Sequence, residues 1–214
     1  INVFDGATRF FRGKRMDGNW ESPFNPLAVG RAYTEATAWQ YRFFVPHDVN
    51  GMIQLFGGKE EFVAALDDIF NTDAEIHGNL VDITGLIGQY VHGNEPSHHI
   101  AYLYNYVGEP WKTQKMSRRL LNEMYHPTPE GIIGNEDCGQ MSAWYILSSM
   151  GLYSVCPGSN EYVLTTPLFE KVVVHLANGR TLTILANDPQ KNIYITKVEL
   201  NGKQIDTNFI TYDC

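Results

Sequence analysis

A cluster of acids and amides near residue 136 has the side-chain types that hydrolytic chemistry uses. Asn135, Glu136 and Asp137 lie between two glycines, directly ahead of a segment that is apolar on almost every side. Two adjacent carboxylates perturb each other's ionisation, as catalytic acids and bases often do, and a buried carboxylate is costly unless it is paired or bound. The alternative is a helix cap with an acid pair in the first turn. The residues alone leave both interpretations open.

A second polar cluster, HGNEPSHH at residues 92–99, is a candidate metal site. Zinc prefers a tetrahedral set of His, Cys or carboxylate ligands, but the adjacent His98 and His99 would point about 100° apart on a helix. Asn94 and Glu95 suit calcium better, because calcium takes about six to eight oxygen ligands that include amide carbonyls. A hydrogen-bonded cap without a metal is the third interpretation.

Two further acids lie near predicted helix starts. Glu35, in GRAYTEATAWQYRF, has the ordinary interpretation of an acid in a first helical turn, where the helix dipole stabilises it. Asp48, in VPHDVNGM, has the ordinary interpretation of an aspartate-containing turn beside Pro46 and Gly51.

The elements that must position these clusters divide the chain near residue 156. Hydrophobic periodicity predicts amphipathic helices before that point, and the segment 139–151 is so apolar that we expect it to be buried on both sides. After it, runs rich in Val, Ile, Thr and Tyr predict short strands, with Asn-Gly turns at 178–179 and 201–202. The predicted helices are 34–45, 59–70, 95–107, 110–125 and 139–151, and the predicted strands are 161–166, 171–177, 180–186 and 192–200.

This pattern predicts a mainly α fold. We expect residues 1–156 to form part of a double-layered helical ring that carries the active site, and residues 157–214 to form a short antiparallel β segment. A helical bundle would give a similar pattern. Residues 1–30 show no sustained periodicity and are expected to form long loops, which tend to be functional.

Composition excludes some functions. The 214 residues carry a net charge of −8, which argues against a nucleic-acid partner because binding the phosphate backbone needs a basic surface. No apolar run has the roughly 18 residues of a membrane span. Three scattered cysteines form neither a disulfide framework nor a zinc motif. The chain starts at Ile1 and ends in the strand-like FITYDC, so we expect it to be part of a longer protein.

Several long motifs, in order, closely resemble signatures of the glycoside hydrolase family 92 α-mannosidases. They are FFRGKRMDGNWESPF, YTEATAWQYRFFVPHD, GNEPSHHIAYLYNY and the stretch that starts at GNEDCGQMSAWYILSSMGLY. The resemblance implies a calcium-dependent, exo-acting α-mannosidase that hydrolyses mannose-containing glycans with inversion, with α-1,2 linkages expected. It also implies an N-terminal β-sandwich, absent from this sequence, paired with an (α/α)6 barrel. The final strands would pack on that sandwich, and the location would be periplasmic or secreted.

The resemblance also implies site roles. Glu35 matches the general acid, Asp137 matches the region of the general base, and Glu136 lies beside it. Asn94 and Glu95 match contacts to calcium or sugar. The remaining candidates are Gln40 as a metal ligand and Trp39, Asp48, His98 and His99 as substrate contacts.

The implied mechanism suits these residue types. An inverting glycosidase needs a protonated carboxyl to donate to the leaving oxygen and an ionised one to activate water, roughly 6.5–9.5 Å apart. Burial of Glu35 among Tyr33, Trp39 and Tyr41 would keep it protonated. Calcium on the mannose hydroxyls would act as template and charge.

Three other interpretations remain. A carbohydrate-binding domain that has lost catalysis would keep the aromatics but need not keep both acids. A polysaccharide lyase on a helical toroid would need positive residues near its base, whereas these motifs are acidic and amide-rich. The third is an inert fragment of a mannosidase, which would lack part of the sugar pocket.

Overall fold

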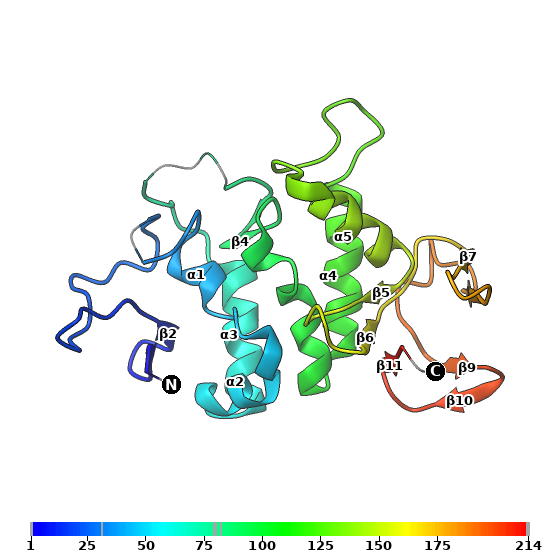
Figure 1. The fold of residues 1–214 in the computed structure, drawn as a ribbon, viewed down its shortest axis with the longest axis horizontal. Helices are drawn as coiled ribbons and strands as arrows, with labels where there is room; N and C mark the ends of the chain where they lie inside the picture. The colour runs from blue at the N-terminus through cyan, green and yellow to red at the C-terminus, as the bar shows by residue number, and fades with distance from the viewer. Residues whose placement is uncertain (1, 31, 79–80, 82, 213–214) are drawn as a thin grey trace.

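The structure is a computed structural model that describes residues 2–30, 32–78, 81 and 83–212. Figure 1 shows the N-terminal loops at one end, a central group of helices and the C-terminal strands at the other end. The α-helices are α1 Ala38–Tyr41, α2 Val49–Phe56, α3 Lys59–Asn71, α4 Pro110–Glu123 and α5 Gln140–Ser149, and the 3-10 helices are η1 Pro46–Asp48, η2 Glu95–Ser97, η3 Ile100–Val107 and η4 Asp137–Gly139.

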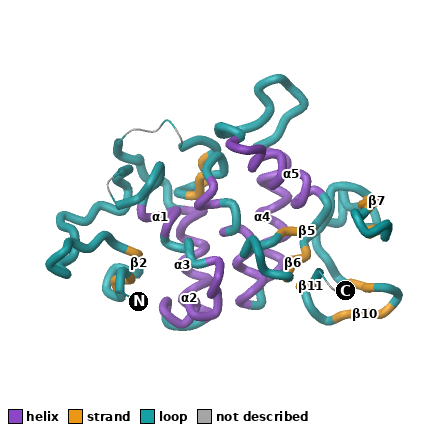
Figure 2. Tube along the Cα trace, viewed as in Figure 1, coloured by secondary structure: helices purple, strands orange, loops and turns teal. Residues whose placement is uncertain are grey.

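The prediction of a mainly α fold, part of an (α/α)6 barrel, is wrong. Helices account for 32% and strands for 20% of the residues, and the described strands form several small antiparallel sheets (Figure 2). The strands are β1 Phe4–Asp5, β2 Phe10–Phe11, β3 Leu86–Ile87, β4 Tyr90–Val91, β5 Leu152–Tyr153, β6 Glu161–Leu164, β7 Lys171–His175, β8 Thr181–Leu185, β9 Val198–Leu200, β10 Lys203–Ile205 and β11 Phe209–Thr211. Turn-forming Gly, Pro and Asn residues shorten the helices that periodicity alone predicts.

The main hydrophobic core lies where α3, η3 and α4 pack together. Phe62, Leu66 and Ile69 recur at helical spacing on α3 and are fully buried, while the acids of α3 lie on the opposite face. The predicted helices at 59–70 and 110–125 are therefore confirmed in type and nearly in length.

Two predicted helices differ from the structure. The segment 34–45 is helical only in α1, which starts at the capping box of Thr37 and ends with Arg42 as its C-cap, well before Pro46. The segment 95–107 forms η2 and η3 instead of one α-helix.

The sequence pattern does not predict helix α2. The segment was interpreted as a turn at Asp48, and the turn is there, but the Asp48 carboxylate also accepts a hydrogen bond from Gly51 N at 2.8 Å and so begins a helix. The buried Met52, Ile53 and Phe56 then add this helix to the core.

Helix α5 confirms the predicted helix at 139–151, but the prediction that it is buried on both sides is wrong. Trp144 is 2% exposed, whereas Ile146 is 56% exposed. Ala143 is exposed as well, so this face of α5 is not buried in the described part of the chain.

Both Asn-Gly turns join antiparallel strands, as predicted. The turn at Asn201–Gly202 links β9 to β10, and Asn178–Gly179 lies in the loop between β7 and β8. Asn201 and Gly202 both have positive φ, 50° and 78°, which is the geometry of a two-residue hairpin turn. Strand β6 lies between β5 and β11.

The strand segment is held on α4 by buried polar contacts. The Arg118 guanidinium donates to the carbonyls of Pro189 and Pro167, both at 2.8 Å, and the Ser117 hydroxyl lies 2.9 Å from the Thr165 hydroxyl. The division into units at residue 156 remains a prediction, and these contacts connect its two sides.

Candidate active site

Glu35 lies in a turn before α1. Its φ is 55°, in the left-handed region, and its side chain is exposed. The side-chain amide of Asn94 donates to the Glu35 carbonyl at 2.8 Å. This bond places the candidate acid beside the second polar cluster, although the two residues are 59 positions apart.

The expected burial of Glu35 among aromatic rings is wrong for the described chain. The Tyr33 hydroxyl donates to the Phe11 carbonyl at 2.6 Å, and Trp39 packs edge-on against Phe10 with ring centroids 5.1 Å apart. These aromatic side chains pack with the N-terminal strands, so they leave the carboxylate open.

Gln40 is buried under this turn. Its amide oxygen accepts from the Thr37 backbone N–H at 2.7 Å and from the Thr37 hydroxyl at 2.9 Å, and its NH₂ group donates to the Gln89 carbonyl. Gln40 therefore fixes α1 to the residues before β4. Its role as a metal ligand remains a prediction.

The loop after β4 presents Asn94 and Glu95. The Asn94 side-chain oxygen accepts from Glu95 N at 3.1 Å, which caps η2, and the Glu95 carboxylate is exposed. Both side-chain groups of Asn94 thus hold the loop in shape, while Glu95 is accessible to a ligand.

His98 and His99 lie beneath this loop. Each donates through Nε2 to a backbone carbonyl, His98 to that of His92 (3.0 Å) and His99 to that of Phe43 (2.8 Å). Burial lowers the pKa of both rings to about 4, so both are neutral above that pH and their Nε2 atoms are the donors. Their predicted contact with substrate remains a prediction.

Glu136 and Asp137 are adjacent in the turn before α5, but their carboxylates have different surroundings. Glu136 has φ 54°, and its carboxylate accepts from Ser142 N at 3.2 Å and from the Ser142 hydroxyl at 2.8 Å. It therefore satisfies a free donor at the start of α5, since the N-cap Gly139 has no side chain to do so. The Asp137 carboxylate is exposed and has no hydrogen-bond partner among the described residues.

The loop of residues 93–95 and the loop of residues 134–137 touch through Gly93 and Gly134. A Cβ on Gly134 would lie 2.5 Å from the Gly93 carbonyl oxygen and 2.9 Å from its Cα. Only a residue without a side chain allows this approach, and φ at Gly134 is 86°. The glycine pair and the Asn94–Glu35 bond therefore gather three distant segments at one place.

The side chains of Asp48 and Trp39 make no hydrogen bond to this group among the described residues. Asp48 caps α2, and the Trp39 indole N–H is buried without a partner among the described residues. In the described ranges, no group of three or more His, Cys, Asp or Glu side chains is gathered as a metal site.

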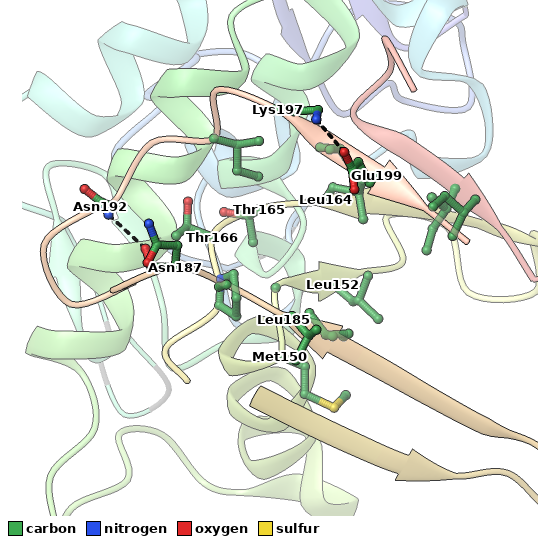
Figure 3. Close-up of a pocket in the computed structure, with 18 of the residues that line it drawn as sticks. Met150, Leu152, Leu164, Thr165, Thr166, Leu185, Asn187, Asn192, Lys197 and Glu199 are labelled. Carbon is green, nitrogen blue, oxygen red and sulfur yellow. Dashed lines mark hydrogen bonds and ion pairs between the residues drawn. The ribbon is translucent and has the colours of Figure 1, made fainter. Parts of the chain in front are cut away.

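A hollow lies elsewhere, between the end of α5 and the strand segment. This cavity of about 490 Å³ is lined mostly by apolar side chains such as Leu152, Leu164 and Leu185 (Figure 3). The Glu199 carboxylate at its edge is paired with Lys197. The cavity therefore lacks a carboxylate pair for glycoside hydrolysis and contains none of the predicted site residues.

Four aromatic rings pack together beneath the site, and of these only His92 belongs to a candidate cluster predicted from the sequence. Tyr90, His92, Tyr125 and Trp144 contact one another below the two loops. His92 and Trp144 lie in motifs named above, but only the fold brings the four rings together.

Comparison with known proteins identifies the family. Residues 1–214 match the model described as the glycosyl hydrolase family 92 catalytic domain. A relative from Arthroderma benhamiae, described as an uncharacterized secreted glycosidase, is 33% identical over 97% of this chain and 27% of its own length.

Two solved structures are similar throughout. A family GH92 α-mannosidase from Bacteroides thetaiotaomicron, in complex with mannoimidazole, is 41% identical with a TM-score of 0.92 over 99% of this chain and 29% of that chain. A family GH92 inverting mannosidase from Bacteroides thetaiotaomicron VPI-5482 is 37% identical with a TM-score of 0.85, over 99% of this chain and 30% of that one. This chain thus spans less than a third of the length of each relative. It belongs to glycoside hydrolase family 92 and carries part of that family's catalytic domain.

Proposed function

We propose that the protein containing this chain is an exo-acting α-mannosidase that hydrolyses its substrate with inversion. The observation that supports this most is the meeting of the Glu35 turn, the 93–95 loop and the 134–137 loop at one place. The solved relatives named α-mannosidase and inverting mannosidase support the same activity. We expect a mannose-containing glycan as substrate, with α-1,2 linkages as the first to be tested.

Glu35 is the general acid and Asp137 is the general base of this proposal. Both carboxylates are exposed at the ends of loops whose backbones are fixed, Glu35 by the bond from Asn94 and Asp137 by the turn that Glu136 holds. Both carboxylate oxygens of Glu136 accept hydrogen bonds from Ser142, so we assign Glu136 the role of positioning this turn. An inverting enzyme needs its two carboxyls roughly 6.5–9.5 Å apart, with room for a water molecule between base and sugar.

Calcium fits the oxygen donors of the middle loop. The Gln40 amide oxygen already accepts two hydrogen bonds from Thr37, so the donors left for calcium are the exposed Glu95 carboxylate and the Asn94 amide oxygen, which has a second lone pair. These residues would hold the ion, which would supply positive charge and a template for sugar hydroxyls when bound. Glu35 and Asp137 would carry the proton transfers.

The chain also needs a partner region to complete its fold. Strand β8 lines the apolar cavity, and apolar side chains on β7 and β8 remain open, with Val173 at 43% and the cavity-lining Leu185 at 72% exposure. Such faces are normally covered by protein. We propose that a β-sandwich domain of the same polypeptide packs against these strands, since the chain covers only 29% of its mannosidase relative.

A periplasmic or secreted location is consistent with the relative that is described as a secreted glycosidase. Among the described residues, no helix is long and apolar enough to cross a membrane.

The test is mannose release from α-1,2-mannobiose by the complete protein, with calcium and again with a chelator. We expect release that depends on calcium, and losses of roughly 100-fold or more in Glu35→Gln and Asp137→Asn, because each removes a proton-transfer group. Glu136→Gln is the matched control for charge in the same loop and should keep most of the activity. Binding of mannose without release by the wild type would support the carbohydrate-binding alternative instead.

A further inference from the structure

A chain of hydrogen bonds runs beneath the two loops of the candidate active site. It is centred on His92, which is fully buried and directly precedes the 93–95 loop. Its Nδ1 lies 2.9 Å from the Tyr90 hydroxyl, and its Nε2 lies 2.8 Å from the Tyr125 hydroxyl. The Tyr125 hydroxyl donates in turn to the Met141 carbonyl at 3.2 Å, in the first turn of α5.

The direction of this chain follows from its donors. Tyr125 gives its single hydroxyl proton to Met141, so it can only accept from His92, whose Nε2 therefore carries the ring proton. Nδ1 is then the acceptor for the Tyr90 hydroxyl. Every donor and acceptor in the chain has a partner, and such networks fix geometry.

A second contact joins the same two regions. The Trp144 indole of α5 donates to the His98 carbonyl at 3.0 Å, and its ring meets His92 edge-on with centroids 4.4 Å apart. Tyr125 stacks parallel to Trp144, with an interplanar angle of 5°. The start of α5, which the Glu136 carboxylate caps by accepting from Ser142, is therefore held directly against the segment 92–98.

We propose that His92 and Tyr125 are positioning residues that set the distance between the 93–95 loop and the 134–137 loop. Through Asn94, which holds Glu35, they also set the distance between the two catalytic carboxylates. The catalytic part of this inference rests on the proposed function, whereas the positioning of the loops does not.

The test compares two tyrosines that both bind α5, in the complete protein. Tyr125→Phe keeps the ring and its stacking on Trp144 but removes the hydroxyl that joins His92 to Met141. Tyr102→Phe is the matched control, because it removes a buried bond of 2.5 Å to Ser148 at the far end of the same helix.

We expect Tyr125→Phe to lower kcat on α-1,2-mannobiose by about 10-fold or more, the factor that a lost interaction of about 1.4 kcal/mol in the transition state produces, with KM changed by less than about 2-fold. Tyr102→Phe should leave kcat within about 2-fold of wild type, although both variants unfold at a slightly lower temperature. If an active wild type loses no more kcat through Tyr125→Phe than through Tyr102→Phe, the inference is wrong.

A distance measurement makes the result independent of activity. Spin labels on the exposed Cys138 and on Thr34→Cys, with the other cysteines replaced by serine, report the separation of the two catalytic turns. The distance distribution should broaden or shift in Tyr125→Phe and stay unchanged in Tyr102→Phe. An unchanged distribution in Tyr125→Phe overturns the inference whatever the activity. A wild type that releases no mannose refutes only the proposed function, and the distances then decide the positioning alone.

Discussion

Replacement of Gly134 by alanine should separate the two loops of the active site. The new Cβ would lie 2.5 Å from the Gly93 carbonyl oxygen, whereas a close C···O contact is about 3.3 Å, so the backbones must move apart by roughly 0.8 Å. Both atoms in conflict at Gly93 belong to the main chain, so no side chain can rotate away. A misplacement near 1 Å can cost about 100-fold in rate, and we therefore expect a 10- to 100-fold lower kcat.

Gly158→Ala is the matched control. Gly158 also has a positive φ, 93°, but a Cβ there meets no atom within 4 Å. Both variants should lose about 1–2 kcal/mol from the left-handed backbone, and only Gly134→Ala should lose stability beyond that and activity as well. Steady-state kinetics and thermal unfolding of the complete protein measure both effects. Wild-type kcat in Gly134→Ala would refute the claim that close contact of these loops sets the geometry of the site.

Three further predictions concern stability. Arg118→Met should cost about 2–3 kcal/mol in a denaturant titration, because two buried carbonyls lose a charged donor, while Arg119→Met, at an exposed ion pair, should cost less than about 1 kcal/mol. Glu136→Ala should cost about 1 kcal/mol through loss of the cap on α5, and an unchanged melting temperature would contradict that role. His99 has a folded pKa of about 4, below its unfolded value near 6.5, so the unfolded state binds more protons in that window. Stability should therefore fall as pH drops from 6.5 to 4, by about 1.4 kcal/mol per pH unit from this residue, and His99→Gln should flatten the slope.

The sequence indicated candidate residues, whose roles remain predictions, whereas its mainly α prediction was wrong. Long motifs identified Glu35, Asn94 and Asp137, because a motif is read directly from neighbouring residues. Periodicity found α3, α4 and α5, whose apolar faces recur at helical spacing over ten or more residues. The Asn-Gly hairpins were predictable for a similar reason, since their turn chemistry is local.

The rest depends on contacts between distant segments. The approach of Gly93 to Gly134 and the hydrogen bond from Asn94 to Glu35 have no local signal, so sequence could not show that the three loops meet. The mainly α prediction failed in part because α1, between the Thr37 capping box and the Arg42 C-cap, has only four residues. The predicted burial of Glu35 failed because its aromatic neighbours pack on the N-terminal strands instead.

The most direct test of the central claim is the stereochemistry of the product. Proton NMR of the complete protein acting on an α-mannoside distinguishes the anomer of mannose that forms first, before mutarotation. A carboxylate pair that activates water across the sugar ring predicts β-mannose as the first product. First release of α-mannose would contradict the assignment of Glu35 and Asp137 as an inverting acid and base.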